Sequence, residues 1–199
     1  MAKAKRIILA STSPFRKKLL SDAGVLFDCE AAIGDEKTIS GLAPQLLAAK
    51  RAEFKALDVA RRMEPDCLVI GADQVLGMDG VSYDKAWSED EAFARLKDFQ
   101  GRTHHLHSAI CVVAVGHDSN CQTVYEGVVD VPMTMKHLTH TDIRQYVATG
   151  EWQGCVGCYR IEGKGRDLFS DVGPDESAII GLPLKPLLEA LIRHNTLNS

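Results

Sequence analysis

The chain has 199 residues, of which 45% are hydrophobic and 25% are charged, a composition typical of globular proteins rather than disordered or fibrous ones. Its 23 lysines and arginines against 27 aspartates and glutamates give a net charge of -4, which disfavours direct binding of nucleic acid. No apolar run approaches the ~18 residues of a membrane helix, and the basic start leads into only about four apolar residues, too few for a signal peptide. We therefore expect a single cytoplasmic domain over residues 1–199, without membrane contact.

The first half of the chain predicts two strand-and-helix units. An apolar run at 6–10 ends in the polar turn Ser11–Pro14, whose proline suits the first position of a helix because its missing N–H is not needed there. A second strand is expected near 25–31, and a long helix from Pro44 to about Met63. Leu68–Asp73 then has the pattern of a buried strand that ends on a carboxylate.

The second half predicts a long antiparallel hairpin and three helices. Met78–Val81 has the composition of a tight hairpin turn, and β-branched residues are frequent at 102–115 and 121–135, on either side of a turn at 117–120. The helices are expected to begin near Ser88, Thr139 and Pro183. Together these elements predict an α/β fold with a mixed, partly antiparallel sheet flanked by helices.

Hydroxyl groups and cations gather where the first helix is expected to begin. Ser11 and Ser13 lie in the turn, and the first helical turn carries Arg16, Lys17 and Lys18. Because cations there oppose the helix dipole, their clustering makes better physical sense if an anion binds among them. The sequence therefore indicates a phosphate site, and the alternative is an N-capping Ser13 beside solvated lysines.

A carboxylate at the end of the buried strand is the second candidate. Asp73 follows small residues that let a ligand approach closely. A carboxylate in such a place can hold a divalent ion or accept a proton from water. The alternative is an aspartate that caps a helix or a turn.

Two further motifs each have a structural alternative. Cys155 and Cys158 have the spacing of a redox or zinc pair, but a second ligand pair at a suitable distance is missing from the sequence. His105 and His107 share a face of an expected strand, and two histidines do not make a metal site. We expect buried thiols and ordinary strand residues, with a thiol or zinc protein as the alternative.

Several ordered stretches together resemble the Maf family of nucleoside triphosphate pyrophosphatases, and the likeness covers nearly the whole chain. These stretches are Leu9–Arg16, Asp35–Glu36, Leu47–Lys50, Ile70–Gln74, Lys85, Gly154–Tyr159, Glu162–Gly163 and Ile180–Leu184. The resemblance implies a Maf/ITPase-like elongated fold with a cleft between two lobes, and a homodimer. It also implies hydrolysis of a nucleotide between its α and β phosphates, which yields a monophosphate and pyrophosphate.

The resemblance also implies roles for individual residues. The residues that it implies for phosphate binding are Ser11, Arg16, Lys50 and Lys85. Asp73, helped by Glu36, would bind a divalent metal ion, Mg²⁺ or Mn²⁺, or activate water. The loop of Lys85 departs from the family pattern, because the usual Gly-Lys-Pro is replaced by Asp84–Ala86.

Three positions differ from the commonest family pattern in the direction of one branch. Many members have an arginine, a threonine and a glutamine where this chain has Phe15, Gln74 and Glu162, and these residues resemble the branch that acts on 7-methyl-GTP. N7-methylation makes guanine cationic, so that an aromatic face such as Phe15 gains a cation–π contact. A carboxylate such as Glu162 accepts hydrogen bonds from the N1–H and amino group of guanine. We therefore predict 7-methyl-GTP as the substrate.

Two other functions stay open on the sequence. The same chemistry on dTTP and UTP differs only in the base, and a glutamine suits the single ring N–H of these bases better. A non-catalytic regulator of septum formation and division, or a nucleic-acid-binding protein, is the alternative from another class. The acidic net charge and the retention of Asp73, Lys50 and Lys85 disfavour it. Trp152 and the acidic loop 167–176 are interpreted as surface features.

Overall fold

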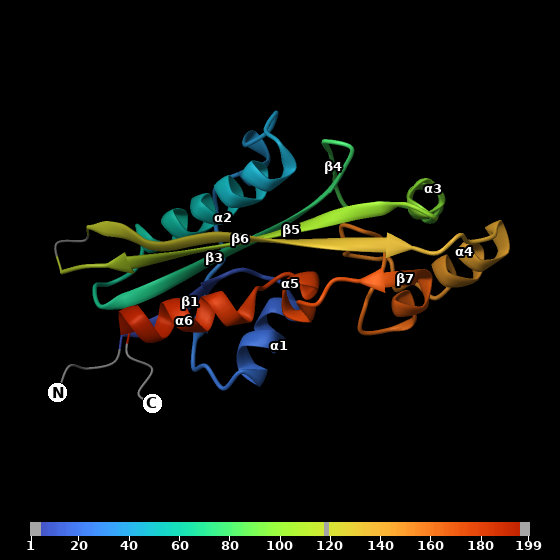
Figure 1. Cartoon of the computed structure of the whole chain (residues 1–199). Coiled ribbons are helices and arrows are strands. Elements are labelled where there is room, and N and C mark those ends of the chain that lie inside the picture. Colours follow the sequence, from blue (N-terminus) through green and yellow to red (C-terminus); the bar gives the residue numbers. More distant parts are fainter. Residues whose placement is uncertain (1–4, 118–119, 196–199) are drawn as a thin grey trace.

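The computed structural model describes residues 5–117 and 120–195, and its centre is a seven-stranded mixed sheet (Figure 1). The strands are β1 (Arg6–Ala10), β2 (Asp28–Cys29), β3 (Cys67–Met78), β4 (Val81–Tyr83), β5 (Thr103–Val115), β6 (Cys121–Met135) and β7 (Phe169–Val172). They follow the order β2-β1-β3-β5-β6-β7, and β4 also pairs with β3. β1 is parallel to β2 and β3, and the other pairs are antiparallel. Residues 1–4 of the basic start, and Asp118 and Ser119 of the expected turn, lie outside the described residues.

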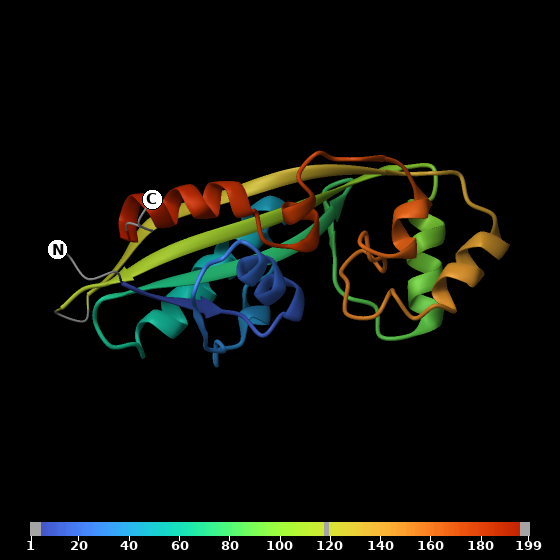
Figure 2. The same ribbon diagram turned by 90° about the horizontal axis from the view of Figure 1, so that it is seen from below.

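Helices cover both faces of the sheet and its far end. The α-helices are α1 (Pro14–Asp22), α2 (Pro44–Ala60), α3 (Glu89–Phe99), α4 (His140–Val147), α5 (Glu176–Ile180) and α6 (Leu184–Asn195). Two 3₁₀ turns are η1 (Glu36–Thr38) and η2 (Lys164–Leu168). Figures 1 and 2 show α2 on one face, α1 and α6 on the other, and α3 and α4 at the end of the long strands, so that the molecule is elongated. Within the described part of the chain, every helix is too short or too polar to cross a membrane.

The core follows the two-residue period of the strands. Along β1, Ile8 packs in the cluster under α2, whereas Ile7 and Leu9 pack in the cluster under α1 and α6. A third cluster fills the far end between α3, α4, the first residues of β5 and the last residues of β6. Trp152 belongs to this cluster with 6% of its surface exposed, so the surface interpretation of Trp152 was wrong. The segment 167–176 also contributes buried residues, because it contains β7.

Most of the expected elements are confirmed, and two strand predictions are wrong. The stretch 25–31 forms only the two-residue strand β2. β3 does not end at Asp73 but continues to Met78, because β5 pairs with it along its length, from Cys67 opposite Val115 to Gly77 opposite His105. Asp73 therefore lies in the middle of a strand, and another feature of the sheet must expose it to a ligand.

That feature is a gap on the other edge of β3. β1 ends where Ala10 pairs with Gly71, and β4 ends where Tyr83 pairs with Leu76. Between them, residues 72–75 have no strand partner on this edge among the described residues. Backbone and side-chain groups of these residues are thus available to the segments that follow β1 and β4, and to a ligand.

Gly71 brings α2 close to this gap. A Cβ atom on Gly71 would clash with the backbone of Ala52 and Ala56, so only glycine allows α2 to lie this near to β3. Alanines at these positions of α2, both fully buried, complete the close approach. Because Lys55 lies between them in the sequence, the contact also carries its side chain to the β3 edge.

His104 makes the far end of the molecule sensitive to acid. Its ring is fully buried, stacks on Phe99 at 4.8 Å and shares a 2.7 Å hydrogen bond with the Tyr159 hydroxyl. Burial lowers the pKa of His104 to about 3 from 6.5. The unfolded chain therefore binds a proton below pH 6.5 that the folded chain takes up only near pH 3, so stability falls as the pH drops through this window.

We expect this histidine to account for a loss of about 2 kcal/mol in unfolding free energy between pH 7 and pH 5. The measurement is urea unfolding of wild type and His104→Phe at both pH values. The variant loses a hydrogen bond at both pH values, but its stability should fall less on acidification. An equal fall in both proteins would show that His104 does not cause the acid sensitivity.

Candidate active site

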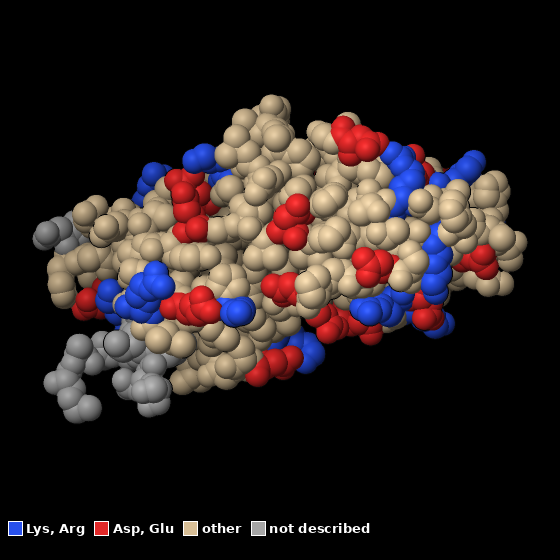
Figure 3. Space-filling model, viewed as in Figure 1, with Lys and Arg blue, Asp and Glu red and all other residues tan. Residues whose placement is uncertain are grey.

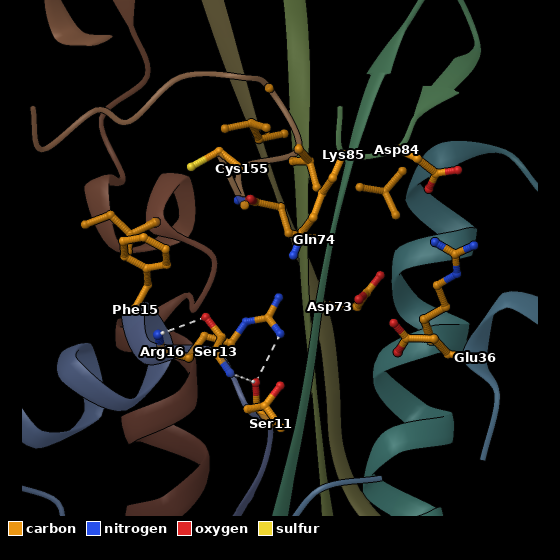
Figure 4. Close-up of a pocket in the computed structure, with 18 of the residues that line it drawn as sticks. Ser11, Ser13, Phe15, Arg16, Glu36, Asp73, Gln74, Asp84, Lys85 and Cys155 are labelled. Atoms are coloured by element: carbon orange, nitrogen blue, oxygen red, sulfur yellow. Dashed lines mark hydrogen bonds between the residues drawn. The ribbon is translucent and has the colours of Figure 1, made fainter. Parts of the chain in front are cut away.

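A cavity of about 1100 Å³ opens beside the gap in β3. Its walls come mainly from seven segments that are far apart in the sequence: the turn after β1, the loop around η1, α2, β3, the loop after β4, residues 153–162 and the end of α5. Figure 4 shows Phe15 and Glu36 on opposite sides, with Arg16 and Asp73 between them and Lys85 reaching in from the loop after β4. The volume suits a nucleotide, since small-molecule pockets usually span several hundred to about 1000 Å³.

Arg16 is held in place by main-chain carbonyl groups. Its Nη1 donates to the carbonyl oxygen of Ala72 at 2.9 Å, which the gap in β3 leaves available, and its Nε donates to Gly181 at 2.9 Å. Ser13 caps α1 by accepting from the amide of Arg16, and Ser11 Oγ accepts from the Arg16 guanidinium at 3.4 Å. Burial lowers the pKa of Arg16, and the nearby carboxylate of Asp73 opposes this shift. The structure thus places a rigid cation at the helix N-terminus.

Asp73 and Glu36 are joined by the ammonium group of Lys55. Lys55 Nζ lies 2.7 Å from Asp73 Oδ1 and 2.5 Å from Glu36 Oε2, and only 13% of the lysine side chain is exposed. Burial lowers the pKa of Lys55, the Asp73 charge opposes this, and the charges of Arg16 and Lys85 lower it further. The second oxygen of Asp73, Oδ2, is buried and has no hydrogen-bond partner. Oδ2 is therefore the carboxylate oxygen of this cluster that can bind a metal ion or accept a proton.

The placement of Lys50 in the phosphate site was wrong. Its ammonium group pairs with Glu53 at 2.7 Å, half of its side chain is exposed, and it lines a separate apolar groove with Leu46 and Phe54. Residues five apart on an α-helix point about 140° apart, so Lys50 and Lys55 lie on different sides of α2. The signal that distinguishes them is the buried alanine stripe of α2, which flanks Lys55 and not Lys50.

The loop after β4 contributes Lys85 to the same end of the cavity. Lys85 and Asp84 both line it, and Figure 4 shows the Lys85 chain extended toward Gln74 and Asp73. The charge of Lys85 reaches Lys55, as its effect on the pKa of Lys55 shows. The structure therefore brings together Ser11, Arg16, Glu36, Asp73 and Lys85, as the sequence predicted, and adds Lys55.

Gln74 is fixed by three acceptors. Its Nε2 lies 2.9 Å from Ser108 Oγ and from the carbonyl oxygens of Ala178 and Ile179, at the end of α5. Two of these groups only accept hydrogen bonds, so the amide nitrogen must face them and the orientation of the side chain is set. The remaining oxygen, Oε1, can only accept. Any direct recognition of a base by Gln74 therefore involves an N–H group of the base.

Phe15 lies across the cavity from Glu36 of η1 (Figure 4), and Glu162 is another residue of the lining. Both line it, and Glu162 is exposed. The sequence analysis missed a third side chain there, Arg160, whose guanidinium carbon lies 5.1 Å from the centre of the Phe15 ring. Its position between two stretches that resemble the family, Gly154–Tyr159 and Glu162–Gly163, was the available signal. Phe15 and Arg160 therefore add an aromatic ring and a guanidinium to the lining, whereas around Lys55 the cations Arg16, Lys55 and Lys85 lie beside the carboxylates of Asp73 and Glu36.

The residues fit a divalent metal ion only with help from a ligand. In residues 5–117 and 120–195, three or more histidine, cysteine, aspartate or glutamate side chains nowhere form a group that could hold a metal. Glu36 and Asp73 nevertheless have carboxylate oxygens close to the same point, the ammonium group of Lys55. Asp73 Oδ2 has no hydrogen-bond partner. This set suits Mg²⁺, which typically binds one or two carboxylates and completes its shell with water and substrate phosphates.

Cys155 and Cys158 are both free thiols, and burial raises the pKa of each.

Comparisons with known proteins find relatives that match nearly the whole of this chain. A family model described as Maf-like protein matches residues 6–194. The 7-methyl-GTP pyrophosphatase of Rhizobium meliloti (strain 1021) is 40% identical over 193 residues, covering 93% of this chain and 94% of the relative. The nucleoside triphosphate pyrophosphatase of Rhodopseudomonas palustris (strain BisB18) is 40% identical over 93% of this chain and 92% of its own, and the 7-methyl-GTP pyrophosphatase of Bartonella quintana (strain Toulouse) is 39% identical over 96% of each.

A solved structure is also similar, the nucleoside-triphosphatase / dITP/XTP pyrophosphatase of Mycobacterium abscessus. It covers 95% of this chain and 93% of its own at 14% identity, and its TM-score of 0.41 is too low to support an argument. The assignment rests on the family model and on the relatives that span both chains almost completely. The chain therefore belongs to the Maf family.

Proposed function

We propose that this protein is a pyrophosphatase that hydrolyses 7-methyl-GTP to 7-methyl-GMP and pyrophosphate. The observation that carries the proposal is the cluster of Asp73, Lys55 and Glu36 next to the fixed guanidinium of Arg16, all in one nucleotide-sized cavity. The names of the Rhizobium meliloti and Bartonella quintana relatives support this substrate. The name of the Rhodopseudomonas palustris relative supports the wider class.

The cation-rich end of the cavity suits the triphosphate. A nucleoside triphosphate carries roughly four negative charges, and its hydrolysis requires stabilisation of the charge that develops as pyrophosphate leaves. Arg16 and Lys85 both line this part of the cavity, and their positive charges can contact these phosphate oxygens. Because Arg16 is already held by Ala72 and Gly181, it does not have to be ordered when the substrate binds.

Asp73 is placed to handle the proton of the attacking water. Lys55 holds Oδ1, so Oδ2 remains to accept a proton or to bind a metal ion. Water attacks the α phosphorus, the bond to the bridging oxygen breaks, and its electron pair leaves with pyrophosphate while the water proton passes to the carboxylate. Asp73 with Glu36 would hold a divalent ion, which would supply Lewis-acid stabilisation of the phosphate charge when bound.

The other end of the cavity suits the base. Glu162 would repel phosphate groups, but it can accept hydrogen bonds from the N1–H and amino group of guanine, and so can Gln74 Oε1. Phe15 offers an aromatic ring to the cationic 7-methylguanine. UTP and dTTP have a single ring N–H between two acceptors, and they match two acceptor side chains less well.

The test is pyrophosphate release from 7-methyl-GTP, GTP, UTP and dTTP with Mg²⁺ or Mn²⁺. We expect 7-methyl-GTP to have the highest kcat/KM. A preference for UTP or dTTP would support the proposed pyrophosphatase activity but contradict 7-methyl-GTP as the substrate. Absence of release from all four would favour a non-catalytic role instead.

Basic and acidic side chains are interspersed on the face shown in Figure 3, which does not favour a nucleic-acid surface there.

Glu162→Gln is the variant that examines the base assignment. Loss of one charge-assisted hydrogen bond is expected to lower the ratio of kcat/KM for 7-methyl-GTP to that for UTP by about tenfold. Glu176→Gln, at an exposed position outside the cavity, is the matched control and should leave the ratio unchanged. The same ratio in wild type and Glu162→Gln would show that Glu162 does not recognise the base.

The homodimer and the cytoplasmic location stay predictions.

A further inference from the structure

The guanidinium of Arg160 packs against the Phe15 ring, which is the ring on which the base stacks in the proposed function. Its guanidinium carbon lies 5.1 Å from the centre of the Phe15 ring, and both side chains line the cavity. A base that stacks on Phe15 from the cavity therefore meets the guanidinium. The stacked arginine also shows that this ring accepts a cation, which is the property required for a methylated guanine.

The main chain of Arg160 is fixed, but its side chain is not locked by hydrogen bonds at Nε. Its amide donates to the Tyr146 hydroxyl at 3.0 Å, and Gly165 packs directly against its backbone. In contrast, the Nε atom is buried and has no hydrogen-bond partner. A buried donor without an acceptor is unfavourable. The guanidinium packs on the Phe15 ring and also interacts with the Cys155 thiol, but an incoming ligand can displace it without breaking a hydrogen bond of Nε.

We propose that Arg160 is a specificity-determining residue that competes with the base for Phe15 and so limits the preference for a cationic base over a neutral one. This inference rests on the proposed function, because it requires the base to stack on Phe15. A methylated guanine suffers both the competition for the ring and the repulsion between two positive charges. Neutral guanine suffers only the competition. Arg160 therefore reduces the advantage that methylation would otherwise confer.

The test is the ratio of kcat/KM for 7-methyl-GTP to that for GTP in wild type and Arg160→Met. Methionine keeps much of the length of arginine and removes its charge. We expect the ratio to rise about tenfold in the variant, mainly through KM, because the variant removes the repulsion between the guanidinium and the cationic base, which neutral guanine does not experience. Arg160→Lys keeps the charge and should retain the wild-type ratio. Arg166→Met, at an exposed position outside the cavity, is the matched control.

A Phe15→Leu background separates competition from a structural effect. Without the ring, Arg160→Met should no longer change the ratio, whereas a general loosening of the cavity would act in both backgrounds. If Arg160→Met does not fold, Arg160→Gln gives the same comparison. If GTP is turned over too slowly, inhibition by 7-methyl-GMP and GMP gives the same ratio.

The outcomes distinguish this inference from the proposed function. An unchanged or lower ratio in Arg160→Met, with 7-methyl-GTP still hydrolysed, overturns only the role of Arg160. Absence of pyrophosphate release by the wild type from any of the nucleotides overturns the proposed function itself. A rise in the ratio that persists in the Phe15→Leu background overturns the competition and indicates a charge effect elsewhere in the cavity.

Discussion

Replacement of Asp73 by asparagine is expected to lower kcat for pyrophosphate release by about 10² to 10³-fold. The substitution keeps the shape of the side chain, but the amide can neither accept the proton of water nor attract a divalent ion. Asp73 Oδ2 is the unpartnered buried oxygen of the cluster, so its charge is the property that the change removes. The measurement is the steady-state rate on the best substrate at saturating Mg²⁺, together with the temperature of unfolding.

Two comparisons make this result specific. Asp171→Asn, at an exposed position on β7, should have the wild-type kcat, which controls for loss of one carboxylate from the chain. Asp73→Asn should remain folded, because Lys55 still has Glu36 as a partner. A folded Asp73→Asn protein with more than a tenth of the wild-type kcat would exclude Asp73 as base and as an essential metal ligand.

Exchange of Lys55 for methionine is expected to lower kcat/KM by about 10²-fold, whereas the same exchange at Lys50 should leave it unchanged. Lys55 holds Asp73 Oδ1 and Glu36 Oε2, and its loss leaves two carboxylates facing one another beside the phosphate site. Lys50 contacts Glu53 on another side of α2. The two variants change the same charge on the same helix, so each controls for the other.

The reverse outcome is equally informative. Loss of activity in Lys50→Met with normal activity in Lys55→Met would restore the placement derived from the sequence and contradict the geometry of α2. Because removal of a partner from a buried ion pair costs about 3–5 kcal/mol, unfolding temperatures must accompany the rates. Lys55→Arg, which keeps the charge, should retain more activity than Lys55→Met.

Local chemistry made much of the fold predictable. Ser88 caps α3, Thr139 forms a capping box on α4, and Pro14 begins α1, because each of these depends on hydrogen bonds between near neighbours in the chain. The tight turn after β3 needs two residues with positive φ, and Asp79 and Gly80 adopt them. Such features were visible in the sequence because their partners lie within four residues.

The site was predictable only where its residues belong to short motifs. Ser11, Arg16, Glu36, Asp73 and Lys85 were identified by their stretches, and the cavity brings them together. The assignment of Lys50 failed because it rested on the short stretch Leu47–Lys50, whereas the lysine that lines the cavity depends on which side of α2 faces β3. Burial of Trp152 was missed because its partners lie on α3, α4 and distant strands.

The sequence by itself determined the periodicities, caps and turns, and with them an α/β fold of known family and most of the residues of the phosphate site. Tertiary structure alone decided that Asp73, although buried, lines the cavity at a gap between β1 and β4 rather than at the end of its strand. It also decided that Lys55 pairs with Asp73, and that Arg160 covers Phe15. The physical reason is that strand pairing, helix facing and side-chain stacking join residues that are distant in the chain, so no local pattern records them.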